Sequence, residues 1–175
     1  SFCRGRFEFE VALHQLSGMG TEQQPGPLRG LLARLGVLDR LSFVEMKNLY
    51  RLFIPGQMDI TLKADRQAVI KELKQRFPAQ SQGIEAFFQL VYDFCMQMIG
   101  CVFMRDPEAG KEKYPLYFTY ALKDSQEVLD AYLKDPLLQA AVSPYWGYMG
   151  LPPSMLSFMD FAMVLFAYIE FKPYH

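Results

Sequence analysis

The stretch from Ile84 to Met104 constrains the fold of this chain more than any other part of the sequence. Almost every position in it is apolar, but polar residues recur at every fourth position and would form one narrow stripe along a helix. These polar residues are Glu85, Gln89, Asp93 and Gln97. The pattern predicts a long helix that is buried on most of its sides, and it favours this interpretation over a membrane span.

A second apolar stretch, from Leu151 to Phe171, is also close to the length of a membrane span. Asp160 lies near its middle and Glu170 near its end. A carboxylate at the centre of a bilayer is costly, so a helix packed against protein is again favoured. We expect Asp160 to be a paired structural carboxylate rather than a catalytic acid or base.

Two segments in the first half of the chain alternate between apolar and polar residues, as half-buried strands do. They span residues 44–54 and 58–62, and Pro55-Gly56 between them has the composition of a tight turn. The sequence therefore predicts a β-hairpin. The stretch from Arg6 to Leu13 also alternates and predicts a half-buried strand, with His14 at its end.

Helical spacing of apolar residues predicts most of the remaining structure. The expected helices, besides the long one, span residues 28–35, 65–77, 115–122, 125–134, 137–148 and 153–170. Asp65 can cap one of them and Pro78 ends it. We therefore expect an α+β fold in a single domain over residues 1–175, in which a small antiparallel sheet, including the hairpin at 44–62, packs with a predominantly helical layer.

Composition argues against several classes of function. The 18 Lys and Arg against 19 Asp and Glu give a net charge of −1, which lacks the basic excess of a nucleic-acid-binding protein. Cys3, Cys95 and Cys101 lack the paired spacing of zinc sites, and the chain has only two histidines, so no metal site is expected. We expect reduced thiols and a cytoplasmic location. The N-terminus shows neither a signal-peptide pattern nor a start methionine, which favours a fragment.

The chain carries no catalytic motif that functions by itself. Gly18-Met19-Gly20 resembles the start of a dinucleotide fingerprint, but Gln23 stands where the third glycine is needed, and a plain loop is favoured. Neither a phosphate-binding loop nor a Gly-x-Ser-x-Gly nucleophile turn is present. We therefore expect no tight binding of flavin or nicotinamide by this chain alone.

The segment Tyr145-Trp146-Gly147-Tyr148-Met149 concentrates aromatic and methionine side chains. Such residues usually pack in a core, but they also line adaptable apolar pockets. His14 is by default a core or rim histidine, and a functional role is the alternative.

Three groups of motifs resemble one known family. The first consists of Pro136-Leu137-Leu138-Gln139-Ala140 and Trp146-Gly147-Tyr148-Met149-Gly150-Leu151-Pro152-Pro153-Ser154. The second consists of Leu49-Tyr50-Arg51-Leu52-Phe53-Ile54-Pro55-Gly56 followed by Asp59-Ile60, Ala64-Asp65-Arg66, Phe77-Pro78 and Gly83-Ile84. The third is Phe9-Glu10-Val11-Ala12-Leu13-His14-Gln15, which resembles a Phe-Asp-x-Gly-x-His pattern with Glu10 and Ala12 substituted. On these residues the chain resembles the flavin-dependent phytoene desaturases, carotenoid isomerases and retinol saturases.

The resemblance covers nearly the whole chain but only the middle of a family member. It implies the substrate-binding, central portion of a larger FAD-dependent oxidoreductase that lacks the Rossmann FAD domain and is inactive alone. FAD would belong to the full-length parent, with none bound to this chain. The implied reaction is a hydride or proton-assisted redox change at a conjugated polyene of carotenoid or retinoid type.

The resemblance also implies an apolar tunnel, with His14 and Tyr174 nearest the flavin. The implied substrate-binding residues are His14, Tyr145, Trp146, Met149, Met163, Phe166 and Tyr168. The implied partners are an apolar small-molecule substrate and the missing FAD-binding domain. Peripheral membrane contact or a homo-oligomer, formed through the last two helices and the strand that ends at His14, stays open. Two other functions also stay open, a non-catalytic module that binds an apolar ligand or a membrane surface, and a helical interaction protein.

Overall fold

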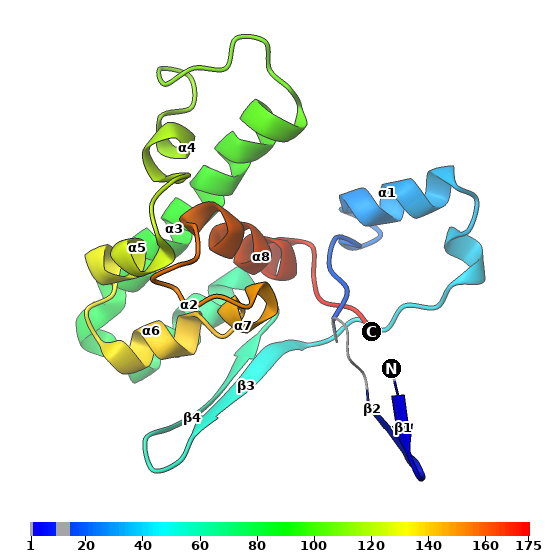
Figure 1. Cartoon of the computed structure of the whole chain (residues 1–175), viewed down its shortest axis with the longest axis horizontal. Coiled ribbons are helices and arrows are strands. Elements are labelled where there is room, and N and C mark those ends of the chain that lie inside the picture. The colour runs from blue at the N-terminus through cyan, green and yellow to red at the C-terminus, as the bar shows by residue number, and fades with distance from the viewer. Residues whose placement is uncertain (1, 10–14) are drawn as a thin grey trace.

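Helix α3 (Ser81–Met98) is the centre of the helical part of the molecule in the computed structural model, which describes residues 2–9 and 15–175 (Figure 1). Helices α2 (Arg66–Arg76), α4 (Pro115–Tyr120), α5 (Ser125–Tyr132) and α8 (Phe158–Glu170) pack against it. Its buried side chains are Ile84, Phe87, Phe88, Leu90, Val91, Phe94, Cys95 and Met98. The long core helix predicted from the apolar stretch is confirmed, and it begins three residues earlier than Ile84.

The polar stripe of α3 makes hydrogen bonds and ion pairs within the helix and with neighbouring helices. Glu85 pairs with Lys74 of α2, and the Gln89 amide donates to Asp93 Oδ2 at 2.8 Å. Gln97 Oε1 accepts from the backbone N–H groups of Leu116 and Tyr117 at 2.8 and 3.2 Å. These two N–H groups lie in the first turn of α4 and have no partner within their own helix, so Gln97 supplies the cap that α4 lacks.

The predicted hairpin is confirmed. Strand β3 (Asn48–Ile54) pairs antiparallel with β4 (Met58–Lys63), and Gly56 takes the left-handed conformation with φ of 72°. On β4, every second side chain is buried against the helices. Leu49 departs from the expected alternation: the register shifts between Asn48 and Tyr50, and Leu49 is buried beside the half-buried Tyr50. The fold is α+β, as the sequence predicts.

Two other predicted helices differ from the structure by more than a residue or two at their ends. The helix expected over 137–148 is two helices, α6 (Pro136–Val142) and α7 (Trp146–Met149), because Pro144 lacks the N–H that a continuous helix requires. The helix expected from Pro153 begins at Phe158. Its first turn is capped by Ser157, whose hydroxyl accepts from Asp160 N at 3.2 Å and donates to Asp160 Oδ2 at 2.7 Å. Asp160 is thus paired with the capping hydroxyl of Ser157.

The remaining short elements connect these parts. They are α1 (Pro27–Arg34) and the single turns η1 (Leu38–Arg40), η2 (Pro78–Gln80) and η3 (Ile99–Phe103). Asp65 caps α2 by accepting from Ala68 N at 2.9 Å, as predicted. η3 is a π-helical turn that extends α3 beyond Met98.

The first hairpin is exposed. Among the described residues, strands β1 (Phe2–Arg4) and β2 (Phe7–Phe9) pair only with each other, and every residue in both is exposed. The prediction of a half-buried strand over residues 6–13 is therefore wrong for its described part, and residues 10–14 lie outside the described residues. The apolar face that was expected to be covered instead carries a stacked pair, Phe2 and Phe9, with ring centroids 5.0 Å apart.

Three extended segments, 15–20, 44–46 and 173–175, lie side by side next to the helices, and we call them the neck (Figure 1). Tyr174 exchanges two backbone hydrogen bonds with Leu16 at 2.7 and 2.8 Å, and His175 exchanges two with Val44 at 2.9 Å. Segment 173–175 is thus the middle one, antiparallel to both neighbours. The buried Tyr174 side chain donates to Gly20 O at 2.6 Å.

The loop between α3 and α4 is held together by Asp106. Its carboxylate pairs with Lys113 Nζ at 2.7 Å and accepts from the Tyr114 hydroxyl at 2.5 Å and from Glu108 N at 2.9 Å. The hydrogen bonds from Lys113, Tyr114 and Glu108 lower the pKa of Asp106 from 3.8 to about 2.

We expect this loop to open as the pH falls towards 2. A carboxylate with a lowered folded-state pKa stabilises the folded loop above pH 3.8 and loses that contribution as it is protonated near pH 2. Asp106→Ala should therefore lower the protection of the amides in 105–114 against hydrogen exchange several-fold at pH 7. In this variant the protection should no longer fall as the pH approaches 2. Glu112→Ala, at an exposed neighbour, is the control. Equal protection in wild type and Asp106→Ala would contradict the assignment.

Candidate functional site

Four tyrosines from three parts of the chain pack against one another. Tyr145 stacks on Tyr168 of α8 with centroids 4.7 Å apart and an interplanar angle of 13°. Tyr50 of β3 meets Tyr145 edge-on at 5.2 Å, and Tyr148 of α7 lies 5.5 Å from Tyr145 and 6.2 Å from Tyr168. We call Tyr50, Tyr145, Tyr148 and Tyr168 the tyrosine cluster. It joins the hairpin, α7 and α8 at one place.

Gln15 connects this cluster to the neck. Its side-chain amide donates to Leu49 O at 2.6 Å, and its Oε1 accepts from the Tyr145 hydroxyl at 3.1 Å. The Tyr168 hydroxyl donates to the backbone carbonyl of Gln15 at 2.8 Å. Gln15 is the residue after His14 in the sequence, and its hydrogen bonds tie the first neck segment to β3, α8 and the start of α7.

Three of these tyrosines, Tyr50, Tyr145 and Tyr168, are hydrogen-bond donors rather than bases. Burial raises the pKa of Tyr168 to about 12, and it raises the pKa values of Tyr50 and Tyr145 beyond the usual range. The Tyr50 hydroxyl donates to Ala141 O at 2.8 Å. At neutral pH these phenols are therefore protonated and serve to fix the position of the rings.

Exposed apolar side chains follow Tyr145 along α7 and the loop after it. Trp146, Tyr148 and Met149 of α7 are 40, 37 and 38% exposed. The loop after Gly150, which ends α7 with a φ of 73°, adds Leu151 and Met155 at 41 and 68%. We call these five residues, Trp146, Tyr148, Met149, Leu151 and Met155, the α7 surface. Five large exposed apolar side chains within ten residues are candidates for a ligand or partner site.

The structure separates the substrate-binding residues that the family resemblance implies into groups at different places. Tyr145, Trp146, Met149 and Tyr168 lie together at the tyrosine cluster and the α7 surface. Phe166 lies on the other side of α8, because two residues turn a helix by about 200°. Its ring packs 5.8 Å from Tyr92 of α3 and 5.7 Å from Phe171.

Met163 and Tyr174 occupy other places. Met163 is half-buried and three residues before Phe166, so it lies on the Phe166 side of α8. Tyr174 is buried inside the neck. His14 lies outside the described residues. Sequence reasoning did not include Gln15 and Tyr50 in the site, since only the folded chain brings them to Tyr145.

The loop at 18–26 does not fit a flavin or nicotinamide pyrophosphate. Its amides are used within the loop: Gly26 N donates to Met19 O at 2.9 Å, Thr21 N donates to Gln24 O at 3.0 Å and Leu28 N donates to Gly18 O at 2.9 Å. A Cβ on Gly20 or Gly26 would overlap the opposite side of the same loop. The glycines thus allow the loop to close on itself, not to approach a phosphate. The plain-loop interpretation of Gly18-Met19-Gly20 is favoured by this geometry.

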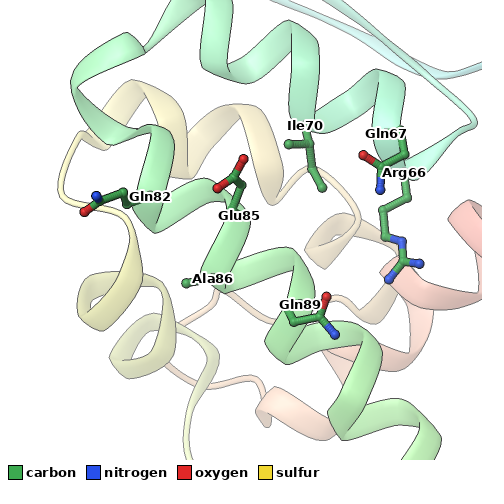
Figure 2. A pocket seen from close by; sticks show the side chains of 7 residues that line it. All are labelled: Arg66, Gln67, Ile70, Gln82, Glu85, Ala86 and Gln89. Carbon is green, nitrogen blue, oxygen red and sulfur yellow. The ribbon is translucent and has the colours of Figure 1, made fainter.

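A hollow of about 560 Å³ lies between α2 and α3, away from the tyrosine cluster (Figure 2). Its lining is mostly polar and consists of Arg66, Gln67, Ile70, Gln82, Glu85, Ala86 and Gln89. Figure 2 shows these side chains along the two helices, with Arg66, Gln67 and Ile70 on α2 and the others on α3. The mixed lining does not suit a long apolar ligand.

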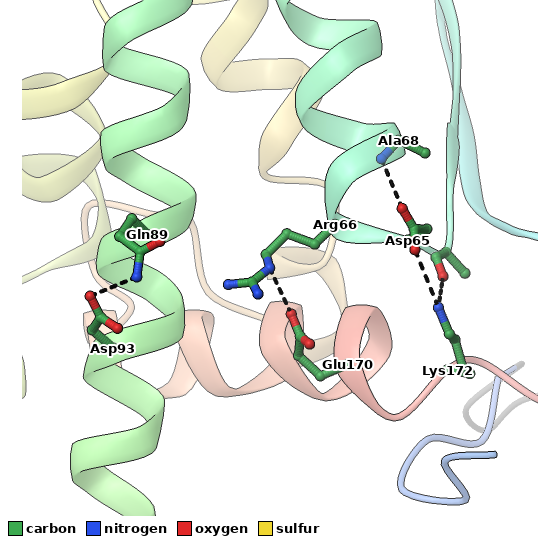
Figure 3. A network of polar contacts seen from close by, with 8 residues as sticks. Asp65, Arg66, Ala68, Gln89, Asp93, Glu170 and Lys172 are labelled. Carbon is green, nitrogen blue, oxygen red and sulfur yellow. Dashed lines mark hydrogen bonds and ion pairs between the residues drawn. The ribbon is translucent and has the colours of Figure 1, made fainter. Parts of the chain in front are cut away.

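Beside this hollow, a polar network fastens α2 to the end of α8 (Figure 3). Arg66 Nε lies 3.3 Å from Glu170 Oε1, and its guanidinium lies 4.0 Å from the centre of the Tyr92 ring. Lys172 Nζ donates to Ala64 O at 2.6 Å and lies 3.9 Å from Asp65 Oδ2. Burial raises the pKa of Glu170 although Arg66 and Lys172 oppose the shift. Each charge has a partner here, so we assign the network a structural role.

Within the described residues, no group of three or more His, Cys, Asp or Glu side chains is placed to hold a metal ion. The three cysteines are unpaired thiols, and burial raises the pKa of Cys95 to about 12. That thiol is therefore protonated at neutral pH and is a poor nucleophile.

Searches against protein-family models, curated proteins and solved structures find no match to this chain. The site therefore has to be argued from its own residues. Its strongest feature is the α7 surface supported by the tyrosine cluster, at the point where Gln15 joins the neck.

Proposed function

We propose that this chain is the substrate-binding part of an FAD-dependent oxidoreductase that acts on an apolar polyene of carotenoid or retinoid type. The α7 surface would bind the polyene, and a flavin-binding part joined through the neck would cover it. The observation that carries the proposal is the position of the α7 surface: exposed aromatic and methionine side chains adjoin the neck through Tyr145, Tyr168 and Gln15.

The chemistry of the α7 surface suits a conjugated chain. Flat aromatic rings stack on extended π systems, and methionine adapts to irregular apolar shapes. No charged residue occurs between Tyr145 and Phe158. A polyene there would meet no desolvated charge, and its conjugated plane could lie along Trp146 and Tyr148.

The division of tasks follows from what these residues offer. FAD, when bound to the flavin-binding part, supplies the hydride chemistry. The α7 surface binds the polyene and excludes water from it. The tyrosine cluster holds α7 rigidly, since the Tyr145 and Tyr168 hydroxyls are both fixed by hydrogen bonds to Gln15.

A titration with all-trans-retinol tests the proposal on this chain, because Trp146 is its single tryptophan. Retinol absorbs where indole emits, so binding beside Trp146 should quench its fluorescence in a saturable manner. Tyr148→Ser/Met149→Ser removes two apolar contacts and should weaken retinol binding by about tenfold or more. Phe53→Ser, at a 61% exposed position on β3, is the matched control and should leave the affinity unchanged.

Flavin retention separates the proposal from the alternative of a non-catalytic ligand-binding module. After mixing with FAD and gel filtration, the chain alone should retain no stoichiometric flavin, whereas a longer parent protein should be yellow. A parent that co-purifies with a polyene but without flavin would support the binding module instead. Quenching that does not saturate, or that is equal in Tyr148→Ser/Met149→Ser, would refute polyene binding at the α7 surface.

A further inference from the structure

A second hollow, of about 300 Å³, lies between β4 and α2, and we call it the β4–α2 groove. Helix α2 begins three residues after β4 ends, so the two walls of the groove are neighbours in the chain. The residues that line it are Thr61 and Lys63 of β4 and Ala68, Lys71, Glu72 and Gln75 of α2. Five of the six are polar, so the groove suits a polar ligand.

The walls of the groove carry a net positive charge. Residues 58–76, which include both elements, contain five Lys and Arg against three Asp and Glu, a balance of +2. Four of these eight residues have ion-pair partners on other elements, namely Arg51, Glu85, Glu170 and Lys172. These partners are two cations and two anions, so the balance of +2 remains when they are counted.

The excess positive charge is distributed along the groove. Lys63, Lys71 and Arg76 are exposed and make no ion pair within the described part of the chain. The pKa of Asp59 is lowered by its hydrogen bond from Arg51 and also by the charge of Arg76, which places Arg76 near the Asp59 end of β4. Lys63 lies at the other end of β4. An anionic ligand would therefore meet cations at both ends of the groove.

Strand β4 also offers backbone hydrogen-bonding groups. Among the described residues, its sheet contains only β3 and β4, so β4 is an edge strand. Every second residue of an antiparallel strand turns its N–H and C=O away from its partner, and an extended segment can add there as a further strand. Thr61 and Lys63 lie on the exposed face of β4. Side chains at alternate positions of an added strand would lie beside them.

The length and charge of the groove favour an acidic peptide segment over other occupants. The wall from Asp59 to Lys63 is about 13 Å long, the length of about four extended residues. A second copy of the chain would bring the same balance of +2 to the contact and would be repelled. A nucleic acid needs a broader basic surface, and the whole chain has a net charge of −1.

We propose that the β4–α2 groove binds an acidic, extended segment of a partner protein, which adds to the edge of β4 as a third strand. Carboxylates at alternate positions of the segment pair with Lys63, Lys71 and Arg76. This inference goes beyond the proposed polyene chemistry and uses none of the residues of the α7 surface.

Fluorescence anisotropy with a fluorescein-labelled peptide, Thr-Glu-Val-Glu-Val-Glu-Thr, tests the proposal on the whole chain. Wild type should bind this peptide saturably. Lys63→Glu/Lys71→Glu should weaken binding by about tenfold or more, because attractive charge pairs become repulsive. Arg34→Glu/Arg40→Glu is the matched control: it makes the same change in net charge at exposed positions of α1 and η1, and it should leave the affinity within about twofold.

Hydrogen exchange tests whether the peptide adds as a strand. The bound peptide should protect the β4 amides that do not bond to β3. The peptide Thr-Lys-Val-Lys-Val-Lys-Thr has the same strand-forming pattern with the opposite charge, and it should neither bind nor protect these amides. Circular dichroism of each variant checks that it is folded.

Five results would overturn the proposal. Three concern the peptide: no saturable binding by wild type, equal affinity of wild type and Lys63→Glu/Lys71→Glu, or binding without protection of β4 amides. The fourth is tighter binding of a single-stranded DNA oligonucleotide or of phosphatidylserine vesicles through the same two lysines. The fifth is a wild-type dimer that becomes monomeric in Lys63→Glu/Lys71→Glu, which would assign the edge of β4 to a second copy. Failure of retinol binding with peptide binding intact would refute the polyene proposal alone.

Discussion

Phe158→Ala is expected to destabilise the protein by about 3–5 kcal/mol, the largest effect of any single substitution that we predict. Phe158 is fully buried at the start of α8, with its ring 5.1 Å from that of Phe94 and 5.9 Å from that of Tyr120. It therefore joins α8 to α3 and α4, and its removal leaves a cavity that three helices would have to close. Because the surrounding rings are held by their own contacts, little relaxation is expected.

Chemical denaturation followed by circular dichroism measures this loss, and a thermal midpoint lower by on the order of 10 °C should accompany it. Phe53→Ala is the control, since Phe53 is 61% exposed and its loss should change the free energy of unfolding by about 0.5 kcal/mol or less. A loss below about 1.5 kcal/mol for Phe158→Ala would mean that the helices repack around the cavity.

Gly83→Ala is the second large prediction, although it adds only one methyl group. Gly83 lies in the first turn of α3, where the backbone of α3 approaches the carbonyl of Tyr132 at the end of α5, and an added Cβ would overlap that oxygen. A backbone oxygen cannot rotate away as a side chain would. The nearby hydrogen bond from Lys134 N to Gln80 Oε1, at 2.9 Å, also holds the two segments together. We expect a loss of about 2–3 kcal/mol or more.

Gly30→Ala provides a matched comparison with the opposite sign. Gly30 is also inside a helix, α1, but nothing lies within 4 Å of an added Cβ. Alanine there should stabilise the protein by about 0.5–1 kcal/mol through helix propensity. If both substitutions stabilised the protein, the close approach of α3 to α5 would be wrong.

The elements that sequence patterns predicted correctly are those encoded by adjacent residues. Pro55-Gly56 sets the hairpin turn by itself, and Asp65 caps α2 through an amide three residues away. The apolar stretch of α3 needed no partner to be recognised, because its polar stripe already defined a helix. Such signals depend only on neighbouring residues, so they do not require knowledge of the tertiary contacts.

Two helix boundaries were predicted wrongly although local residues mark them, because the apolar spacing continues past both. Pro144 interrupts the helix expected over 137–148, and the Ser157–Asp160 cap marks the true start of α8. In both places the apolar spacing continued through the break. A missing N–H or a capping side chain therefore outweighs spacing when the two disagree.

The site was only partly predictable. Tyr145 and Tyr168 stack on each other, but Phe166 and Tyr168, two residues apart, could not share one side of a helix. Helical geometry alone could have separated them. The hydrogen bonds of Gln15 to Leu49 and Tyr145 had no signal in the sequence, since they join residues far apart along the chain.

The neck has a practical consequence for protein engineering. Leu16 and Tyr174 lie on adjacent antiparallel segments, where backbones are about 5 Å apart. The whole unit from Gln15 to His175, whose ends flank this pair, could therefore be inserted into a surface turn of an unrelated host without stretching either protein, as domain insertions and circular permutations require. Tyr145, Tyr168 and Gln15 couple the α7 surface to the neck. In a fluorescent host, a structural change caused by a ligand on the α7 surface would therefore reach the insertion point and alter the emission of the host.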